Sequence, residues 1–466
     1  MEMGQNDPIP NIPRKIIKRN TIKEDKTIAI TVIDSVPGSY KTTWAIQEIN
    51  THPERLYLII VPLRTEISRY RDAIHTSTYT PIFYDRTRQK LDNLKELIEM
   101  GVNIVSTHAL FLSADREVVE LLRAKNYYLI IDEALSVSAI ISVSESYVND
   151  EDESYSMKDI PRLKPSEIHW LLENNHIEIM EDKSVHWLGH PTGYHRYQWV
   201  ENLCNNEALT YLDGEIMMWN FPPVIFDVVS EVYLLTYLFR GSLMESYMEL
   251  FKKKYILKCI SEINPMGSDN KRFRLVTHNP KAENRQKYKD LINLCGDNSL
   301  NAIGTKSDKR YPLSVGWYKN NNKGQKLGLK ALKNNTLTYL RNRVAAPRES
   351  VMLTTYKNYV SVITPKGYKT VDDEKKESTY VSCNAKASND YRSRYNLVYL
   401  CDRHLNPNII RFFENYNIVV DRDNFSLSEL LQWVFRSKIR NGEKINLYLP
   451  SSRMRNLLLD WLSEAG

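Results

Sequence analysis

Cysteine is scarce and long apolar runs are missing from this 466-residue sequence. The five cysteines lie far apart and form no C-x-x-C pair, so neither a disulfide framework nor a zinc ribbon is expected. No apolar stretch approaches the roughly 18 residues that a membrane-spanning helix needs. We therefore expect a chain with no membrane partner, located in a reducing compartment such as the cytoplasm.

A large excess of charge of one sign is also missing. The sequence has 63 Lys and Arg residues against 57 Asp and Glu, which gives a net charge of +6. This mild excess permits a nucleic-acid partner without requiring one. The hydrophobic content of 42% is ordinary for a globular protein, and the length favours two or three domains.

The residues around Lys41 have the pattern of a phosphate-binding loop. Residues 27–33 form an apolar run typical of a buried strand, a turn follows, and helical spacing of apolar residues begins at Trp44. In such a unit backbone N–H groups cradle an anion, the lysine reaches the β- and γ-phosphates, and a hydroxyl binds Mg²⁺. The predicted nucleotide-binding residues are Gly38, Ser39, Lys41, Thr42 and Thr43, with Thr42 as a Mg²⁺ ligand.

Two glycines of the phosphate-loop signature G-x-x-x-x-G-K-[ST] are absent. Ser35 and Tyr40 stand in their places, and only Gly38 lies within the turn. Tyr40 brings a Cβ and a ring to a point where backbone normally crowds the phosphates, which leaves the hydrolysis rate open. On this segment alone, an ordinary strand–turn–helix with a surface lysine is the alternative.

Further strands and helices alternate after this unit. Apolar runs at 55–67, 102–111 and 127–135 are separated by helical patterns such as 87–100, which predicts a parallel sheet with helices on both faces. The run YYLIIDEAL places Asp132 and Glu133 at the carboxyl end of its strand, where ligands bind in such sheets. We expect Asp132 to hold Mg²⁺ and Glu133 to polarise the attacking water. The alternative is a helix whose first turn happens to be acidic.

The rest of the chain divides into an insert and a second domain. Residues 149–217 break the alternation and read as an inserted subdomain, and 231–251 reads as the last strand of the first sheet with its helix. Residues 298–345 are rich in Lys, Asn and Arg, which predicts either nucleic-acid contact or a solvated surface. Strands are expected at 350–356, 379–385, 395–401 and 444–450.

A helix is predicted over 424–442. Ser426 and Glu429 form a capping-box pattern, and Gln432, Arg436 and Arg440 then recur every four residues on one face. Guanidinium groups aligned in this way suit a site that neutralises transferred phosphoryl charge. The alternative is a basic solvated helix face.

The order of these segments resembles that of superfamily 2 DNA/RNA helicases of the phage and plasmid replication type. VPGSYKTT looks like motif I, VPLRTE like motif Ia, DEAL like motif II, LLTYLF like motif III and MLTTY like motif IV. CNAKASNDY occupies the place of motif V, and QWVFRSKIR is similar to motif VI, with Phe435 for its glycine and Arg440 one position late. The resemblance implies nucleic-acid contacts at Arg64, Thr107, Thr354, Asn384 and Asn389.

This resemblance implies an α/β fold with two RecA-like parallel-sheet domains and an inserted subdomain in the first. We predict a basic lead-in over 1–24, a first domain over 25–260 and a second over 261–466, with ATP and Mg²⁺ in the cleft between them. Catalysis is expected from Glu133, Gln432, Arg436 and Arg440. The implied function is an ATP-dependent helicase or translocase that acts on DNA rather than RNA in the cytoplasm of a bacterial host.

Two other functions stay open. A DNA-packaging motor ATPase shares motifs I and II, and an origin-binding or scaffold protein with a degenerate ATP site would keep the fold without turnover. The sequence leaves the oligomeric state, the direction of translocation and the role of residues 149–217 undetermined.

Overall fold

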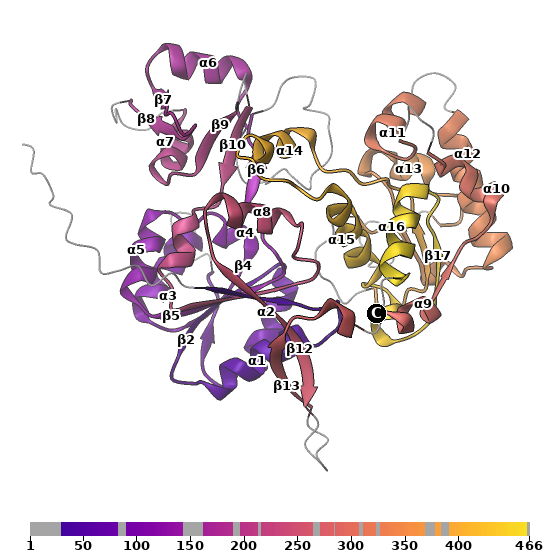
Figure 1. The fold of residues 1–466 in the computed structure, drawn as a ribbon, viewed down its shortest axis with the longest axis horizontal. Helices are drawn as coiled ribbons and strands as arrows, with labels where there is room; N and C mark the ends of the chain where they lie inside the picture. The colour runs from indigo at the N-terminus through magenta and orange to yellow at the C-terminus, as the bar shows by residue number, and fades with distance from the viewer. Residues whose placement is uncertain are drawn as a thin grey trace, which may run out of the picture.

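The structure is a computed structural model in which eleven stretches of the chain are described. They are residues 29–82, 90–142, 162–189, 196–212, 216–263, 271–283, 285–306, 311–322, 327–368, 378–383 and 391–463. The predicted lead-in over 1–24 lies outside these residues. The predicted α/β fold with two parallel-sheet domains is confirmed, and Figure 1 shows the two lobes side by side.

The first lobe is built on an eight-stranded sheet in the order β13-β12-β1-β11-β5-β2-β4-β3. All neighbouring strands are parallel except β12 and β13. The central strands are buried along almost their whole length and are mostly apolar, because both faces of the sheet are covered. Their bounds are β1 Ile30–Asp34, β2 Leu56–Val61, β3 Thr78–Tyr79, β4 Asn103–Thr107, β5 Tyr127–Asp132, β11 Glu231–Thr236, β12 Tyr255–Ile263 and β13 Arg272–Thr277.

Helices cover both faces of this sheet. Helices α1 (Lys41–Thr51) and α2 (Arg64–Arg71) pack on one face through a core that includes Trp44 and Tyr70. Helices α3 (Lys90–Met100), α5 (Arg116–Ala124) and α8 (Leu243–Leu250) pack on the other, and the short α4 (His108–Phe111) follows β4. Because β1, β11 and β5 are parallel neighbours in this sheet, their carboxyl ends meet at one edge.

An insert lies between β5 and β11. It contains β6 (Ser138–Ile140), α6 (Pro165–Glu173), β7 (Ile177–Ile179), β8 (Val185–Trp187), α7 (Gln198–Asn205), β9 (Leu209–Leu212) and β10 (Ile216–Asn220). Strands β6, β10 and β9 form an antiparallel sheet above the first lobe (Figure 1). The inserted elements begin before residue 149 and end after residue 217, so the insert is wider than the sequence indicates.

The second lobe has a four-stranded parallel sheet in the order β14-β17-β16-β15. Its strands are β14 Ile292–Leu294, β15 Val351–Thr354, β16 Asn396–Tyr399 and β17 Ile445–Tyr448. Its α-helices are α9 Gln286–Leu291, α10 Asn298–Asn301, α11 Val315–Asn322, α12 Leu327–Thr338, α13 Val360–Ile363, α14 Pro407–Glu414, α15 Arg422–Val434 and α16 Ser452–Ser463. In the described part of the chain no helix is long and apolar enough to cross a membrane.

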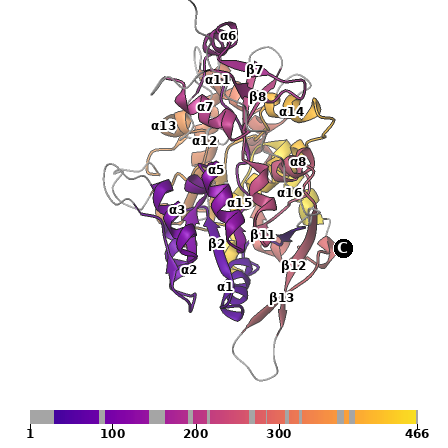
Figure 2. The same ribbon diagram turned by 90° about the vertical axis from the view of Figure 1, so that its left-hand side faces the viewer.

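Two sequence predictions about strands are wrong. Strand β11 is not the last strand of the first sheet, because the hairpin β12–β13 follows and pairs beside β1. The boundary placed after residue 260 therefore cuts a hairpin that belongs to the first lobe up to Thr277 (Figure 2). The strand predicted at 379–385 is reduced, within the described residues 378–383, to one bridge between Tyr380 and Leu353.

The lobes are joined in two places. Helix α14 leaves the second lobe and packs Ile409 and Phe413 into a core with Leu212 and Met218 of the insert. Lower down, Asn424 of α15 donates to the carbonyl of Leu238, 3.2 Å away, and Trp461 of α16 donates to the Tyr237 hydroxyl at 2.7 Å. These contacts hold the carboxyl edge of the first sheet and the segment from Gln432 to Asn441 of the second lobe against a shared pocket.

Candidate functional site

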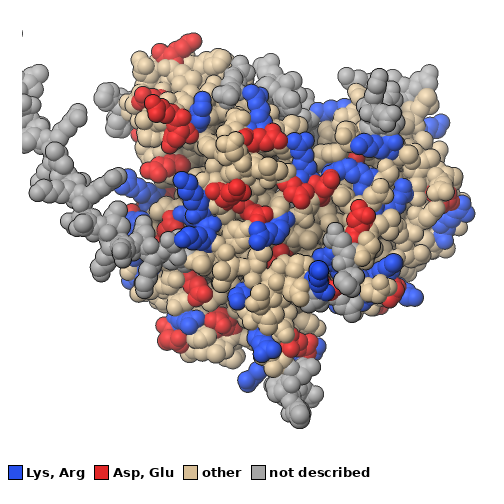
Figure 3. Space-filling view, viewed as in Figure 1, with Lys and Arg blue, Asp and Glu red and all other residues tan. Residues whose placement is uncertain are grey.

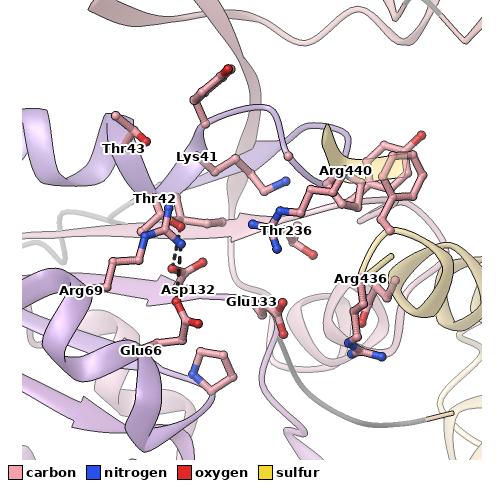
Figure 4. A pocket seen from close by; sticks show the side chains of 18 of the residues that line it. Lys41, Thr42, Thr43, Glu66, Arg69, Asp132, Glu133, Thr236, Arg436 and Arg440 are labelled. Carbon is pink, nitrogen blue, oxygen red and sulfur yellow. Dashed lines mark hydrogen bonds and ion pairs between the residues drawn. The ribbon is translucent and has the colours of Figure 1, made fainter. Parts of the chain in front are cut away.

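A pocket of about 530 Å³ lies between the lobes. The first lobe contributes the loop before α1, the ends of β5 and β11, and one side of α2. The second lobe contributes the end of α15 and the turn after it (Figure 4). The charged residues that line the pocket are Lys41, Glu66, Arg69, Asp132, Glu133, Arg392, Arg436 and Arg440.

The loop between β1 and α1 turns tightly at two residues with positive φ. Gly38 has φ +88°, and Tyr40, directly before the helix, has φ +66° in the left-handed region. That conformation is the one a glycine adopts without strain, and it costs a residue with a Cβ about 1–2 kcal/mol. The Tyr40 ring turns outward and stacks on Phe273 of β13 at 4.9 Å, which offsets part of this cost. Tyr40 therefore adopts the backbone conformation that a glycine would adopt at this position.

Lys41 is the first residue of α1, and its side chain turns back over the loop. Its ammonium donates to the carbonyl oxygens of Ser35 and, at 3.2 Å, Val36. Burial lowers the pKa of Lys41 to about 8, although the carboxylates of Asp34, Asp132 and Glu133 oppose the shift. The loop thus already holds the Lys41 ammonium in place for an anionic ligand, and the neighbouring carboxylates balance its charge only in part.

Nucleotide affinity should depend on pH through Lys41. A bound phosphate favours the charged ammonium and so raises its pKa, which makes binding proton-linked. The affinity should be constant well below pH 8 and should fall above it by up to about tenfold per pH unit, as free Lys41 loses its proton. A titration with a fluorescent nucleotide across this range measures the effect, with Lys41→Ala as the control that removes it. An affinity that stays flat for more than about one pH unit above the free pKa would contradict this prediction.

Thr42 and Asp132 meet at the floor of the pocket, as the sequence predicts (Figure 4). The Thr42 hydroxyl donates to Asp132 Oδ2 at 3.0 Å, and both side chains are buried. Within the described residues, Asp132 Oδ1 accepts no hydrogen bond. One carboxylate and one hydroxyl suit Mg²⁺, which keeps several waters and binds through few protein ligands plus phosphate oxygens.

Glu133 follows Asp132 with φ +67°, a conformation that few non-glycine residues adopt. Its backbone N–H donates to the carbonyl of Leu235 in β11 at 2.9 Å, which holds the turn in place. The side chain lies in the pocket between the two lobes (Figure 4). Backbone strain of this kind concentrates at functional sites.

Gln432, Arg436 and Arg440 all line the pocket, but they do not share one helix. Helix α15 ends at Val434, Arg436 lies in the turn that follows, and Arg440 lies in the 3-10 turn Lys438–Asn441. The predicted capping box is also wrong, because Asp421 caps α15. Ser426 lies inside the helix, and its hydroxyl is within hydrogen-bond distance of two carbonyl oxygens, that of Arg422 in the helix and that of Arg403 outside it. Phe435, in place of a glycine, is 2% exposed and packs on Tyr288 and Trp461.

The two arginines differ in their surroundings. Arg436 is only 5% exposed, and its Nε and Nη1 atoms are buried with no hydrogen-bond partner among the described residues. Burial lowers its pKa, while Glu133 acts in the opposite direction. Arg440 instead lies along the phosphate loop, where its Cγ would be 3.4 Å from a Cβ added to Gly38. Both guanidinium groups thus face the first lobe from the second (Figure 4).

The residues predicted to contact nucleic acid lie on different elements and differ in exposure. Arg64 is exposed at the start of α2, and Thr107 caps α4 by accepting from the Leu110 N–H. The prediction for Thr354 is wrong in this structure because its side chain is fully buried in β15. Asn384 and Asn389 lie outside the described residues.

The sequence did not identify three charged residues of the pocket, Glu66, Arg69 and Arg392, or Tyr70 beneath it, as site residues. Glu66 and Arg69 lie one turn apart on α2 and pair at 3.4 Å, and Arg392 enters from the second lobe. Tyr70, beneath the pocket, donates its hydroxyl to Asp132 at 2.8 Å. The (i, i+3) spacing of Glu66 and Arg69 was the only sequence signal for any of them.

Comparison with known proteins gives a relative along nearly the whole chain. It is the SPbeta prophage-derived uncharacterized protein YonV of Bacillus subtilis (strain 168), 32% identical over 440 residues, which cover 93% of this chain and 98% of that protein. The chain belongs to the YonV family. A sequence profile described as the YonV C-terminal Rossmann-like domain also matches residues 286–462, which include all four strands of the second sheet.

Solved structures give more distant likenesses. An XPD structure, XPD_APO, matches with a TM-score of 0.47 and 11% identity over 92% of this chain and 95% of that one. The DUF1998 helicase MrfA bound to DNA matches with a TM-score of 0.31 and 9% identity over 91% of this chain and 44% of that one. Likenesses this distant carry no argument about function.

Proposed function

We propose that this member of the YonV family is an ATP-driven nucleic-acid motor, a helicase or translocase that hydrolyses ATP between its lobes. The observation that carries the proposal is Arg436, a buried guanidinium whose Nε and Nη1 atoms have no partner among the described residues and which shares the pocket with Glu133. A buried charge without a partner is costly unless a ligand completes it. A nucleotide γ-phosphate bound by the opposite lobe would supply the missing anion.

The pocket residues divide the reaction between the lobes. Lys41 and the N–H groups of its loop bind the β- and γ-phosphates, while Thr42 and Asp132 would hold a Mg²⁺ ion that neutralises phosphate charge. Glu133 orients the attacking water and accepts its proton. Arg436 and Arg440 stabilise charge that develops on the transferred phosphoryl group. Loss of that group removes the anion between the lobes and allows them to shift.

Nucleic acid is the proposed partner, with DNA preferred to RNA. The basic residues within 298–345 motivate a nucleic-acid partner. Lys330, Arg341 and Arg343 are exposed there on the second lobe, although Arg343 also pairs with Asp297 at 2.6 Å. On the face shown in Figure 3, Lys and Arg are more conspicuous than Asp and Glu over this lobe. The prophage origin of the relative supports a role in phage DNA metabolism, with replication as the specific proposal.

Lys41→Ala should remove the activity. ATP hydrolysis by the full chain should rise when single-stranded DNA is added, and Lys41→Ala should lose most nucleotide binding because the loop then lacks its phosphate contact. The assay compares phosphate release with no nucleic acid, with single-stranded DNA, with duplex DNA and with RNA. Absence of hydrolysis in all four conditions would rule out a motor.

A second candidate is a protein that binds nucleotide without turnover. Tyr40 favours it, because a residue with a Cβ and φ +66° sits where the loop approaches the phosphates. In that case ATP would bind in a Lys41-dependent manner, while phosphate release would stay at background with every nucleic acid. The same assay therefore separates the two candidates.

A further inference from the structure

Asp132 is held by more than the phosphate-loop threonine. Its Oδ2 atom accepts two hydrogen bonds, from the Thr42 hydroxyl at 3.0 Å and from the Tyr70 hydroxyl at 2.8 Å. His108 bonds the backbone carbonyl of the same residue through Nε2 at 2.8 Å. Three different segments of the first lobe thus converge on one aspartate.

The arrangement divides the two carboxylate oxygens between separate roles. Both hydroxyl donors point at Oδ2, and among the described residues none donates to Oδ1. With Oδ2 fixed from two sides, the carboxylate cannot rotate about its Cβ–Cγ bond without breaking a hydrogen bond in a buried setting. Among the contacts of the described residues, Oδ1 is therefore the oxygen of Asp132 that is left for a ligand.

Tyr70 is suited to this task as a permanent donor. It is fully buried on α2, and its hydroxyl lies 2.8 Å from Asp132 Oδ2. A phenol keeps its proton at neutral pH, so the hydroxyl is a constant donor to Asp132, with the Thr42 hydroxyl also within its reach. Thr42 differs, because its oxygen would itself bind the metal and its hydrogen bond would have to adjust.

We propose that Tyr70 is a positioning residue for the metal site, which fixes the Asp132 carboxylate so that Oδ1 faces the Mg²⁺ of a bound nucleotide. This inference rests on the proposed function, since it requires a metal–nucleotide complex in the pocket. Groups that orient metal ligands in this way typically contribute about 10- to 100-fold to metal affinity or activity. Tyr70 never touches the metal or the nucleotide.

The experiment compares Tyr70→Phe with wild type by electron paramagnetic resonance of Mn²⁺ added to the protein–ADP complex. Phenylalanine keeps the packing of the ring and removes only the hydroxyl. We expect Mn²⁺ to bind the variant's ADP complex about tenfold more weakly. The affinity for ADP without metal should stay within about twofold of wild type, because no phosphate contact is lost.

Tyr247→Phe is the matched control. Tyr247 is also fully buried in the first lobe, and its hydroxyl donates to a single acceptor, the carbonyl of Phe221, at 2.6 Å. This variant loses a comparable hydrogen bond away from the pocket, so its melting temperature should fall about as much while its Mn²⁺ affinity should match wild type. A general loss of stability would move both variants together.

Asp132→Asn separates failure of this inference from failure of the proposed function. If wild type binds Mn²⁺ with ADP and Asp132→Asn does not, the metal site is present. Equal Mn²⁺ affinity in Tyr70→Phe and Tyr247→Phe would then overturn the role of Tyr70 alone. If wild type binds no Mn²⁺ with ADP, or if Asp132→Asn binds it as wild type does, the metal site of the proposed function fails as well.

Discussion

Glu133→Gln is expected to lower the rate of ATP hydrolysis by at least about 100-fold while nucleotide affinity stays near wild type. A general base typically contributes about 10²–10⁴-fold, and glutamine keeps the shape of glutamate without its proton-accepting charge. The backbone should tolerate the change, because the bond from the Glu133 N–H to the Leu235 carbonyl helps to hold the strained turn and glutamine keeps this N–H. Single-turnover phosphate release gives the rate, and equilibrium titration gives the affinity.

The neighbouring carboxylate provides the contrast for this variant. Asp132→Asn should weaken metal-dependent nucleotide binding, since Asp132 is bonded to Thr42 at the proposed metal site. Glu133→Gln should instead trap bound ATP. If Glu133→Gln hydrolyses ATP at the wild-type rate, Glu133 is not the base. If both variants lose affinity equally, the two carboxylates share one role and the proposed division is wrong.

The sequence predicts the catalytic edge of the first sheet because its signals there are local. An unbroken apolar strand followed by a turn and Lys-Thr places Lys41 and Thr42, and another apolar strand places Asp132 and Glu133. In a parallel sheet the carboxyl ends of such strands share one edge. Thr42 and Asp132 therefore meet at 3.0 Å although 90 positions separate them in the chain.

Features that depend on tertiary contacts could not be predicted in this way. The strands β12 and β13 pair antiparallel, so they break the alternation that identifies parallel sheets, and the polar sequence near them looks like a domain boundary. Tyr70 has the sequence signature of an ordinary buried aromatic residue. Helix α14 resembles any amphipathic helix of the second lobe, yet its apolar face packs on the insert of the first.

The arginine segment shows how residues can line the same pocket although the helix predicted to align them is wrong. A continuous helix would align Gln432, Arg436 and Arg440 by their spacing of four residues. The chain leaves the helix after Val434, and Phe435 fills an apolar site between Tyr288 and Trp461. This packing turns Arg436 inward and carries Arg440 over Gly38, so both arginines still reach the pocket.

Arg436→Met should lower kcat by at least tenfold and probe the second lobe's part in catalysis. An arginine that matches charge developing on the γ-phosphoryl group acts in the transition state, and such groups contribute about 10³–10⁵ in kcat where they have been removed. ATP affinity should fall by a smaller factor than kcat, because the γ-phosphate is the proposed partner of Arg436 while Lys41 and its loop hold the rest of the nucleotide. Arg440→Ala should also lower kcat at least tenfold, with some loss of affinity because this side chain packs on the phosphate loop. Nucleic-acid binding without nucleotide should survive both changes.

Arg436→Met should leave the free protein as stable as wild type or make it more stable. Methionine fills most of the space of the arginine and removes a buried charge whose Nε and Nη1 atoms lack partners within the described residues.

Arg453→Met is the matched control. Its guanidinium lies in the same lobe but is satisfied by Asp402 at 3.0 Å and Asp423 at 2.6 Å, so its loss should lower the melting temperature and leave kcat nearly unchanged. A melting temperature that falls in Arg436→Met with kcat intact would make Arg436 a structural residue. Loss of activity without loss of stability would identify it as a charge retained for a ligand, because only a bound anion compensates the cost of its burial.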